Sequence, residues 1–113
     1  MYTKTLLLCL ALLFSLSAQA SDLPSSIKTG MPYDEAKGSL VADGWKPLVN
    51  SKITNSSLYA QELFEKGSTE VVDCISMEID GCAFRFIKNK KILEIKTITR
   101  DLTVDKFNLI KQK

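Results

Sequence analysis

Two cysteines and two carboxylates are the residues whose types and spacing could do chemistry. Cys74 and Cys82 are separated by seven residues, which is not the spacing of a redox CxxC motif. Glu78 and Asp80 lie between them, and an extended segment would hold their carboxylates about 6.5–7 Å apart on one face. Glycosidases use carboxyl pairs at comparable separations, with the pKa of one raised by burial. This pair is the only basis for an enzymatic interpretation, that of a small carboxylate-dependent hydrolase.

Other catalytic and metal chemistry has little support. The chain has no histidine, the residue used most often as a general base, as the partner of a nucleophile and as a metal ligand. No glycine pattern of a phosphate loop, a dinucleotide fold or a nucleophile elbow occurs. Polar residues such as Glu78 and Asp80 also belong beside a turn glycine. We therefore expect no catalytic residue, no metal site, no cofactor and no enzymatic activity.

The first twenty residues are typical of a cleavable signal peptide. Lys4 precedes an apolar run at 6–16, and Ala18 and Ala20 give the small-x-small pattern of a cleavage site. The run would extend only about 16 Å as a helix, against roughly 30 Å for a bilayer core. We expect cleavage after Ala20, no stable membrane anchor afterwards, and a periplasmic or secreted protein. Cys9 would leave with the peptide.

The mature chain has the size of one domain. We expect a flexible lead-in at 21–29 and a single domain at 30–113. Cys74 and Cys82 are an even pair in an exported chain, which predicts a disulfide. Without Lys4 the chain has fourteen basic and thirteen acidic residues, a net charge near +1. This balance gives no support to nucleic-acid binding, and the basic stretch 88–91 is best explained as a solvated hairpin tip.

One helix and three strands follow from the residue pattern. Pro32 suits the start of a helix and Gly44 its end. The apolar stripe of this helix consists of Tyr33, Ala36, Leu40 and Val41. Period-two segments at 70–76, 82–87 and 92–99, separated by turn residues, predict an antiparallel meander.

Two segments stay open. Residues 58–66 fit either a helix capped by Ser56 or Ser57 or an edge strand, and we slightly favour a strand or irregular segment. Residues 102–113 fit a short helix or a last strand. The predicted fold is α+β, with one or two N-terminal helices on a meander of three to four strands.

The cysteines also predict the strand register. If Cys74 lies opposite Cys82, alternation determines which side chains share a face. The face toward the helix would hold Val72, Cys74, Cys82, Phe84, Phe86, Leu93 and Ile95. The wetter face would hold Asp73, Arg85, Glu94 and Lys96.

Four side chains are candidates for binding a partner. Met77 and Ile79 lie on the loop that the cysteines close, where exposed apolar residues on a rigid loop could anchor another protein. Tyr59 and Trp45 come next, although a lone tryptophan after a helix is more often part of a small core. Asn55 begins an N-glycosylation sequon, which matters only in a host that glycosylates.

The residues from Gly30 to Pro47 match the pattern G-M-x-Y-x-x-A-x-x-x-L-x-x-x-G-W-x-P. With the cysteine hairpin at 70–86, they resemble a group of small bacterial exported proteins whose activity is not established. More loosely, the helix start is similar to the repeat of the β-lactamase inhibitor protein and to small outer-membrane assembly lipoproteins. That resemblance implies an α+β domain that binds other proteins and catalyses nothing. The chain departs from the lipoproteins because it has no acylated cysteine.

The combined expectation is an exported, non-enzymatic protein-binding module, such as an inhibitor or immunity-type protein of the periplasm. The alternative is a structural or assembly factor of the bacterial cell envelope. In either case the expected partner is another protein.

Overall fold

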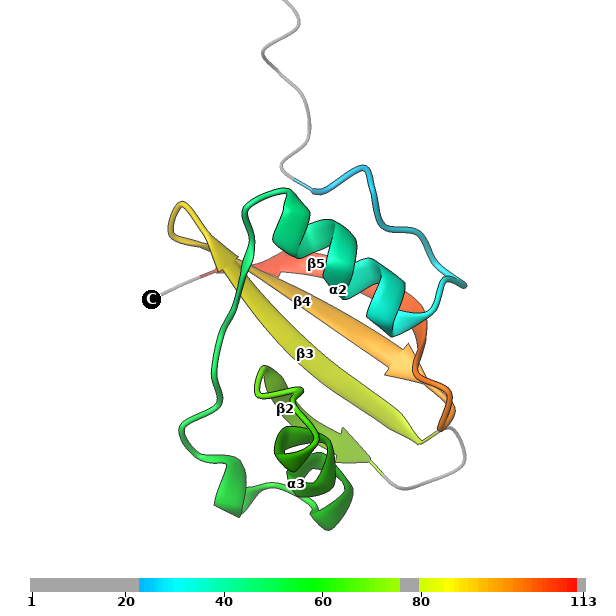
Figure 1. Cartoon of the computed structure of the whole chain (residues 1–113), viewed down its shortest axis with the longest axis vertical. Coiled ribbons are helices and arrows are strands. Elements are labelled where there is room, and N and C mark those ends of the chain that lie inside the picture. Colours follow the sequence, from blue (N-terminus) through cyan, green and yellow to red (C-terminus); the bar gives the residue numbers. More distant parts are fainter. Residues whose placement is uncertain (1–22, 76–79, 112–113) are drawn as a thin grey trace, which may run out of the picture.

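In a computed structural model of the chain, which describes residues 23–75 and 80–111, two helices cover one face of an antiparallel sheet (Figure 1). The helices are α2 (Tyr33–Ala42) and α3 (Leu58–Glu65), with a 3-10 turn, η3 (Ile53–Asn55), before α3. The strands are β1 (Lys46–Pro47), β2 (Val71–Ile75), β3 (Gly81–Lys88), β4 (Lys91–Ile98) and β5 (Thr103–Ile110). The α+β prediction is confirmed, with five strands where we expected three or four.

Strand β3 is the centre of the sheet. On one side it pairs with β4, which pairs in turn with β5. On the other side β2 pairs with the first half of β3, and the short β1 pairs with Phe86 and Ile87 near its end. The two ends of β3 therefore have different neighbours, with the disulfide at its start and β1 and the β3–β4 turn at its finish.

Helix α2 has the predicted boundaries. Pro32 lies in the extended conformation just before the first helical residue, and Gly44 follows the helix with a φ of +96° in the left-handed region. Tyr33, Ala36 and Leu40 are buried as predicted. Val41 was wrongly assigned to the stripe, because it is 50% exposed. Eight residues at about 100° each carry it roughly 80° around the helix from Tyr33.

The predicted register of the cysteines is confirmed. Cys74 lies opposite Cys82, and these two form the disulfide. The helix-covered face holds the predicted residues of β3 and β4, namely Cys82, Phe84, Phe86, Leu93 and Ile95.

In β2 one position was wrong. A β-bulge between Val71 and Asp73 shifts the alternation by one residue. Val71 is consequently fully buried, whereas Val72, the predicted core residue, is only half-buried.

The two open segments are a helix and a strand. Residues 58–65 form α3, contrary to our slight preference for a strand. The Ser57 side chain accepts a hydrogen bond from the Ala60 N–H, which caps the helix. Ala60 and Leu63 are buried in the core. The tail forms β5, which continues the meander beside β4.

The packed core begins before Gly30, the expected start of the domain. Ile27 is 3% exposed and belongs to the core. The Gly30 N–H donates to the Val104 carbonyl, and the Val104 N–H donates to Met31. These bonds attach the residues just before α2 to the outer edge of β5, and the Thr29 hydroxyl of the lead-in donates to the Asp105 carbonyl of the same strand.

Candidate functional site

The disulfide lies at the start of β3, beside the best candidate for a working surface. Cys74 and Cys82 are directly opposite each other, with their Cα atoms 4.0 Å apart and both side chains nearly buried. The bridge closes the segment that carries residues 76–79. Met77 and Ile79, our first candidates for partner binding, lie outside the described residues, as does Glu78.

The Asp73 carboxylate fastens the start of α3 to β2. Its Oδ1 atom accepts hydrogen bonds from the Ser57 N–H at 2.9 Å and from the Cys74 N–H at 2.8 Å. The bond from Ser57, assisted by the bond from Cys74, lowers the pKa of Asp73 below its ordinary value, against a smaller effect of burial. The first turn of α3 is thereby held against the strand that carries the disulfide.

Two exposed aliphatic side chains flank this attachment. Leu58, which follows Ser57, is 83% exposed, and Ile75, two residues after Asp73, is 64% exposed. They are the most exposed large hydrophobic side chains in the part of the chain that the structure describes. Single exposed apolar residues are ordinary. Here two such residues lie on α3 and β2, which the Asp73 carboxylate joins, and the disulfide joins β2 in turn to β3.

Ile75 lines a hollow of about 450 Å³ on the sheet face that the helices leave uncovered. The side of this hollow nearest β2 includes Asp73, and further strands contribute Glu94, Lys96 and Ile98. Arg85 and Glu94 form an ion pair at 2.9 Å on the same face. The face that we predicted to be wetter therefore carries both kinds of side chain. Its charged residues form ion pairs with one another, and isoleucines lie among them.

Tyr59 joins the same end of the molecule through Arg100. The Arg100 guanidinium lies 4.1 Å from the centre of the Tyr59 ring, a cation–π contact. The Arg100 Nε is also 3.7 Å from an Asp80 carboxylate oxygen. Asp80, half of the carboxylate pair considered for catalysis, is thus partnered by an arginine. We call Leu58, Tyr59, Ile75, Asp80 and Arg100 the disulfide end.

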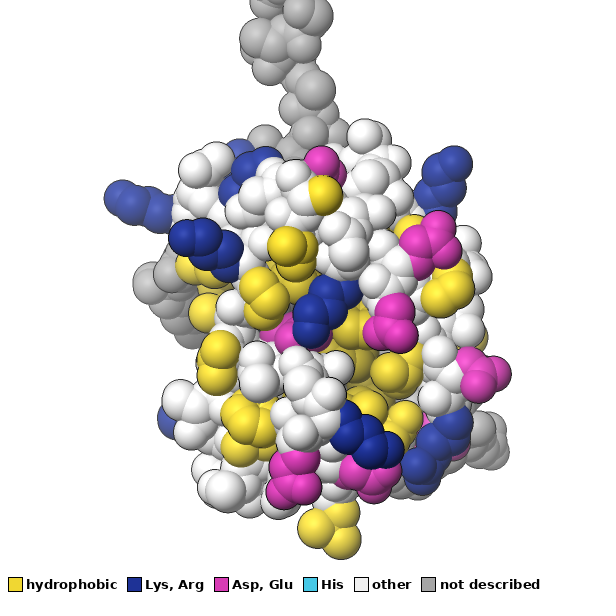
Figure 2. Space-filling view, viewed as in Figure 1, with side chains coloured by type: hydrophobic (Ala, Val, Ile, Leu, Met, Phe, Trp, Pro, Cys, Tyr) yellow, Lys and Arg dark blue, Asp and Glu magenta, His cyan; other side chains and the backbone are white. Residues whose placement is uncertain are grey.

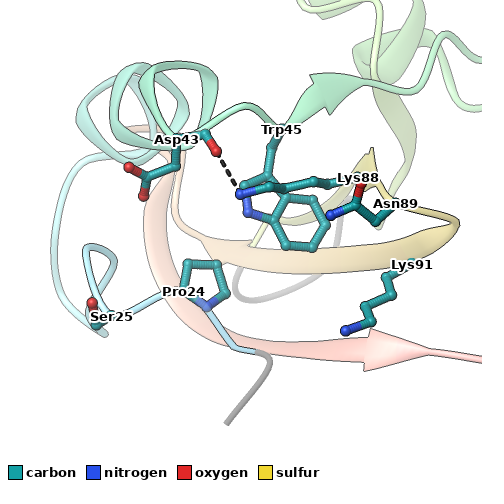
Figure 3. Close-up of a pocket in the computed structure, with 7 residues that line it drawn as sticks. All are labelled: Pro24, Ser25, Asp43, Trp45, Lys88, Asn89 and Lys91. Carbon is teal, nitrogen blue, oxygen red and sulfur yellow. Dashed lines mark hydrogen bonds between the residues drawn. The ribbon is translucent and has the colours of Figure 1, made fainter. Parts of the chain in front are cut away.

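Trp45 lies elsewhere, near the other end of β3. It is 5% exposed and belongs to the core, in keeping with its interpretation as a core residue. Its ring borders a hollow of about 380 Å³ (Figure 3). The Lys88 side chain extends along this hollow, and its Nζ donates a hydrogen bond to the Asp43 carbonyl at 2.6 Å. The structure therefore brings Tyr59 to the disulfide end and leaves Trp45 apart from it.

A buried carboxylate that sequence reasoning missed lies between α2 and the sheet. Glu70 is fully buried, and its carboxylate accepts hydrogen bonds from the Tyr33 hydroxyl at 2.5 Å and from the Lys37 Nζ at 3.1 Å. Burial, and then the Glu70 charge, raise the pKa of Tyr33 far above its ordinary value, so the hydroxyl remains a donor. Both donors come from α2, so this cluster holds the helix in place. A glutamate at the start of a strand gave no signal of this role.

No group of three or more cysteine and carboxylate side chains that could hold a metal occurs within residues 23–75 and 80–111. In the same ranges no helix has the length and apolarity needed to cross a membrane. The disulfide is consistent with an oxidising, exported location.

No protein-family model, curated protein or solved structure matches this chain.

Proposed function

We propose that this chain is an exported, non-enzymatic protein-binding module, of an inhibitor or immunity type, and that it holds its partner through the disulfide end. The observation that carries the proposal is the exposure of Leu58 and Ile75 on two elements joined by the Asp73 carboxylate. A rigid support lowers the entropy lost on binding, so exposed aliphatic groups there contribute more affinity than on a free loop.

The surroundings fit a protein partner better than a small substrate. Tyr59 and Arg100 are residue types enriched at interface hot spots. Arg100 contacts Tyr59, which follows Leu58, and Asp80, which precedes the strand partner of Ile75; these charged groups would form the polar rim of an interface. The hollow beside Ile75 is open and lies on a sheet surface, the shape a protruding side chain of a partner would fill.

Affinity capture from an envelope extract, read by mass spectrometry, tests the proposal. The bait is the chain from Ser21 onward, compared with a Leu58→Gln, Ile75→Thr double variant. Val41→Gln is the matched control, since Val41 is 50% exposed on α2, away from the disulfide end. Thermal unfolding of all three baits verifies that each is folded.

We expect one partner to be captured by the wild type and by the control and lost with the double variant. Truncating each hot-spot residue costs more than about 1 kcal/mol, so the double variant should weaken the dissociation constant at least about tenfold. Equal capture by the double variant would move the interface away from the disulfide end. Capture of no partner by the wild type would contradict the proposed function itself.

A further inference from the structure

Five lysines gather at the end of β3 opposite the disulfide. Lys88 pairs across the β3–β4 turn with Lys91, and Lys90 is in the turn itself. Lys46 of β1 lies opposite Ile87, and Lys111 follows Ile110, which pairs with Ile92. Dark-blue side chains stand over this turn at the upper left of Figure 2. We call Lys46, Lys88, Lys90, Lys91 and Lys111 the lysine end.

An aliphatic row lies between these lysines. Ile87, Ile92 and Ile110 are direct neighbours on three adjacent strands, on the face that the helices leave uncovered. All three are half-buried, so part of each side chain reaches the surface. Lys46 begins the same row on β1. The surface therefore combines an apolar strip with ammonium groups around it.

The nearby acidic residue, Asp43, already has a hydrogen-bond partner for its carboxylate. The Asp43 carboxylate accepts a hydrogen bond from the Ser26 hydroxyl, and its backbone carbonyl accepts one from Lys88. Of the described residues that line the two hollows beside this turn, four are lysines and one, Asp43, is acidic. The net charge near +1 hides this separation, because acidic residues such as Asp73 and Asp80 lie toward the disulfide end.

The chain that precedes the described fold joins it at the lysine end. Pro24 and Ser25 line the hollow beside Trp45 and Lys88 (Figure 3). Seven residues, 17–23, lie between the end of the apolar run 6–16 and Pro24, a reach of at most about 30 Å even if fully extended. An apolar run inserted in a membrane, as the expected signal peptide would be before its cleavage, would keep the lysine end within this reach of the bilayer.

We propose that the lysine end is a docking surface for the anionic headgroups of phospholipids. Aliphatic side chains ringed by lysines match the boundary between headgroups and acyl chains, where apolar atoms are buried and ammonium groups meet lipid phosphates. Single-stranded nucleic acid would instead call for aromatic stacking platforms, which the isoleucine row does not offer. Each lysine near an anionic surface strengthens binding about fivefold.

Sedimentation with lipid vesicles tests this docking surface. The chain from Ser21 onward, which contains every described element, is mixed with vesicles of phosphatidylcholine alone or with added phosphatidylglycerol. The test variant is Lys46→Gln, Lys90→Gln, Lys111→Gln. The charge-matched control is Lys28→Gln, Lys52→Gln, Lys66→Gln, which neutralises three exposed lysines outside the lysine end.

We expect binding to the vesicles that contain phosphatidylglycerol only, weakened by added salt. The test variant should bind about a hundredfold more weakly, and the control should bind within a few-fold of the wild type. Equal weakening in the two variants, or equal binding to neutral vesicles, would overturn the proposal. Retention on polyglutamate without vesicle binding would also overturn it and assign the surface to an acidic protein.

This inference is independent of the proposed function. The lysine variant leaves Leu58 and Ile75 intact, so it should still capture the partner of the disulfide end. Failure of vesicle binding with capture retained would remove only the lipid surface.

Discussion

At the scale of single residues, Glu70 fastens α2 to the rest of the fold through its side chain. It is fully buried, and its carboxylate is satisfied by the Tyr33 hydroxyl and the Lys37 ammonium of α2. A buried charge is tolerated only when it is paired and hydrogen-bonded, as it is here. Tyr33 also stacks on Phe84 with the ring centres 3.9 Å apart, so the cluster and the aromatic core share a residue.

Glu70→Gln should therefore destabilise the protein. The variant keeps the size of the side chain but replaces two charge-assisted hydrogen bonds by weaker ones, at a cost of about 2 kcal/mol in the free energy of unfolding. Glu62→Gln is the control, because the Glu62–Lys66 pair is exposed and should change stability by less than about 0.5 kcal/mol. Urea unfolding measures both. Equal midpoints for the two variants would show that the buried cluster adds no stability.

At the scale of elements, α3 depends on a residue of another strand. Ser57 caps the helix with its side chain, and its N–H is bound by Asp73, sixteen residues further along the chain. A helix of eight residues is too short to be stable alone in water. The attachment to β2 and the burial of Ala60 and Leu63 supply what local propensity lacks.

The Asp73 attachment should make stability depend on pH. The pKa of Asp73 is lower in the folded state than its ordinary value of 3.8. The charged carboxylate therefore stabilises the fold fully above that value, and the contribution is lost as the pH falls through the lower folded-state pKa. Because the group is largely open to solvent, the effect should stay below about 1 kcal/mol.

Asp73→Asn tests this dependence. The difference in stability between wild type and variant should shrink as the pH is lowered from neutral to below 3.8. Denaturant titrations over this pH range provide the measurement. A difference that does not change with pH would rule out the charged attachment.

At the scale of the whole molecule, the two ends of β3 have separate chemistry. The disulfide end exposes aliphatic side chains beside a cation–π pair, and the lysine end carries concentrated positive charge. The core between them consists of the aromatic and aliphatic residues under α2. A domain of this size buries a smaller fraction of its surface than a larger domain does, so a covalent bridge at one end matters for stability.

Removing the bridge should be costly. Replacing Cys74 and Cys82 together by serine opens the loop that the disulfide closes, between two residues that are eight positions apart in the sequence. The chain-entropy relation gives a loss of about 2.5 kcal/mol in the free energy of unfolding. Chemical denaturation of the variant, compared with the oxidised wild type, checks the value. A loss near zero would mean that the register of β2 and β3 is maintained by packing alone.

The disulfide prediction also shows how far local patterns reach. Helix α2 was predictable because its start and end signals, Pro32 and Gly44, lie within the segment itself. Strands β3 and β4 were predictable because alternation is a property of successive residues, and Cys74 opposite Cys82 then set their register. The bulge at Val72 was not predictable, because an extra residue in one strand is defined only by the partner strand.

The sequence by itself determined the α+β class, α2, the three strands of the meander and the cysteine pair, all of which depend on spacing along the chain. Tertiary structure decided the rest. Residues 58–65 became a helix because Asp73 binds Ser57, and the tail became β5 because β4 offered a free edge. The burial of Glu70 under α2 and the gathering of Lys46, Lys88 and Lys111 likewise needed the fold. Contacts between residues far apart in sequence leave no periodic signal, since each partner is set by the path of the whole chain.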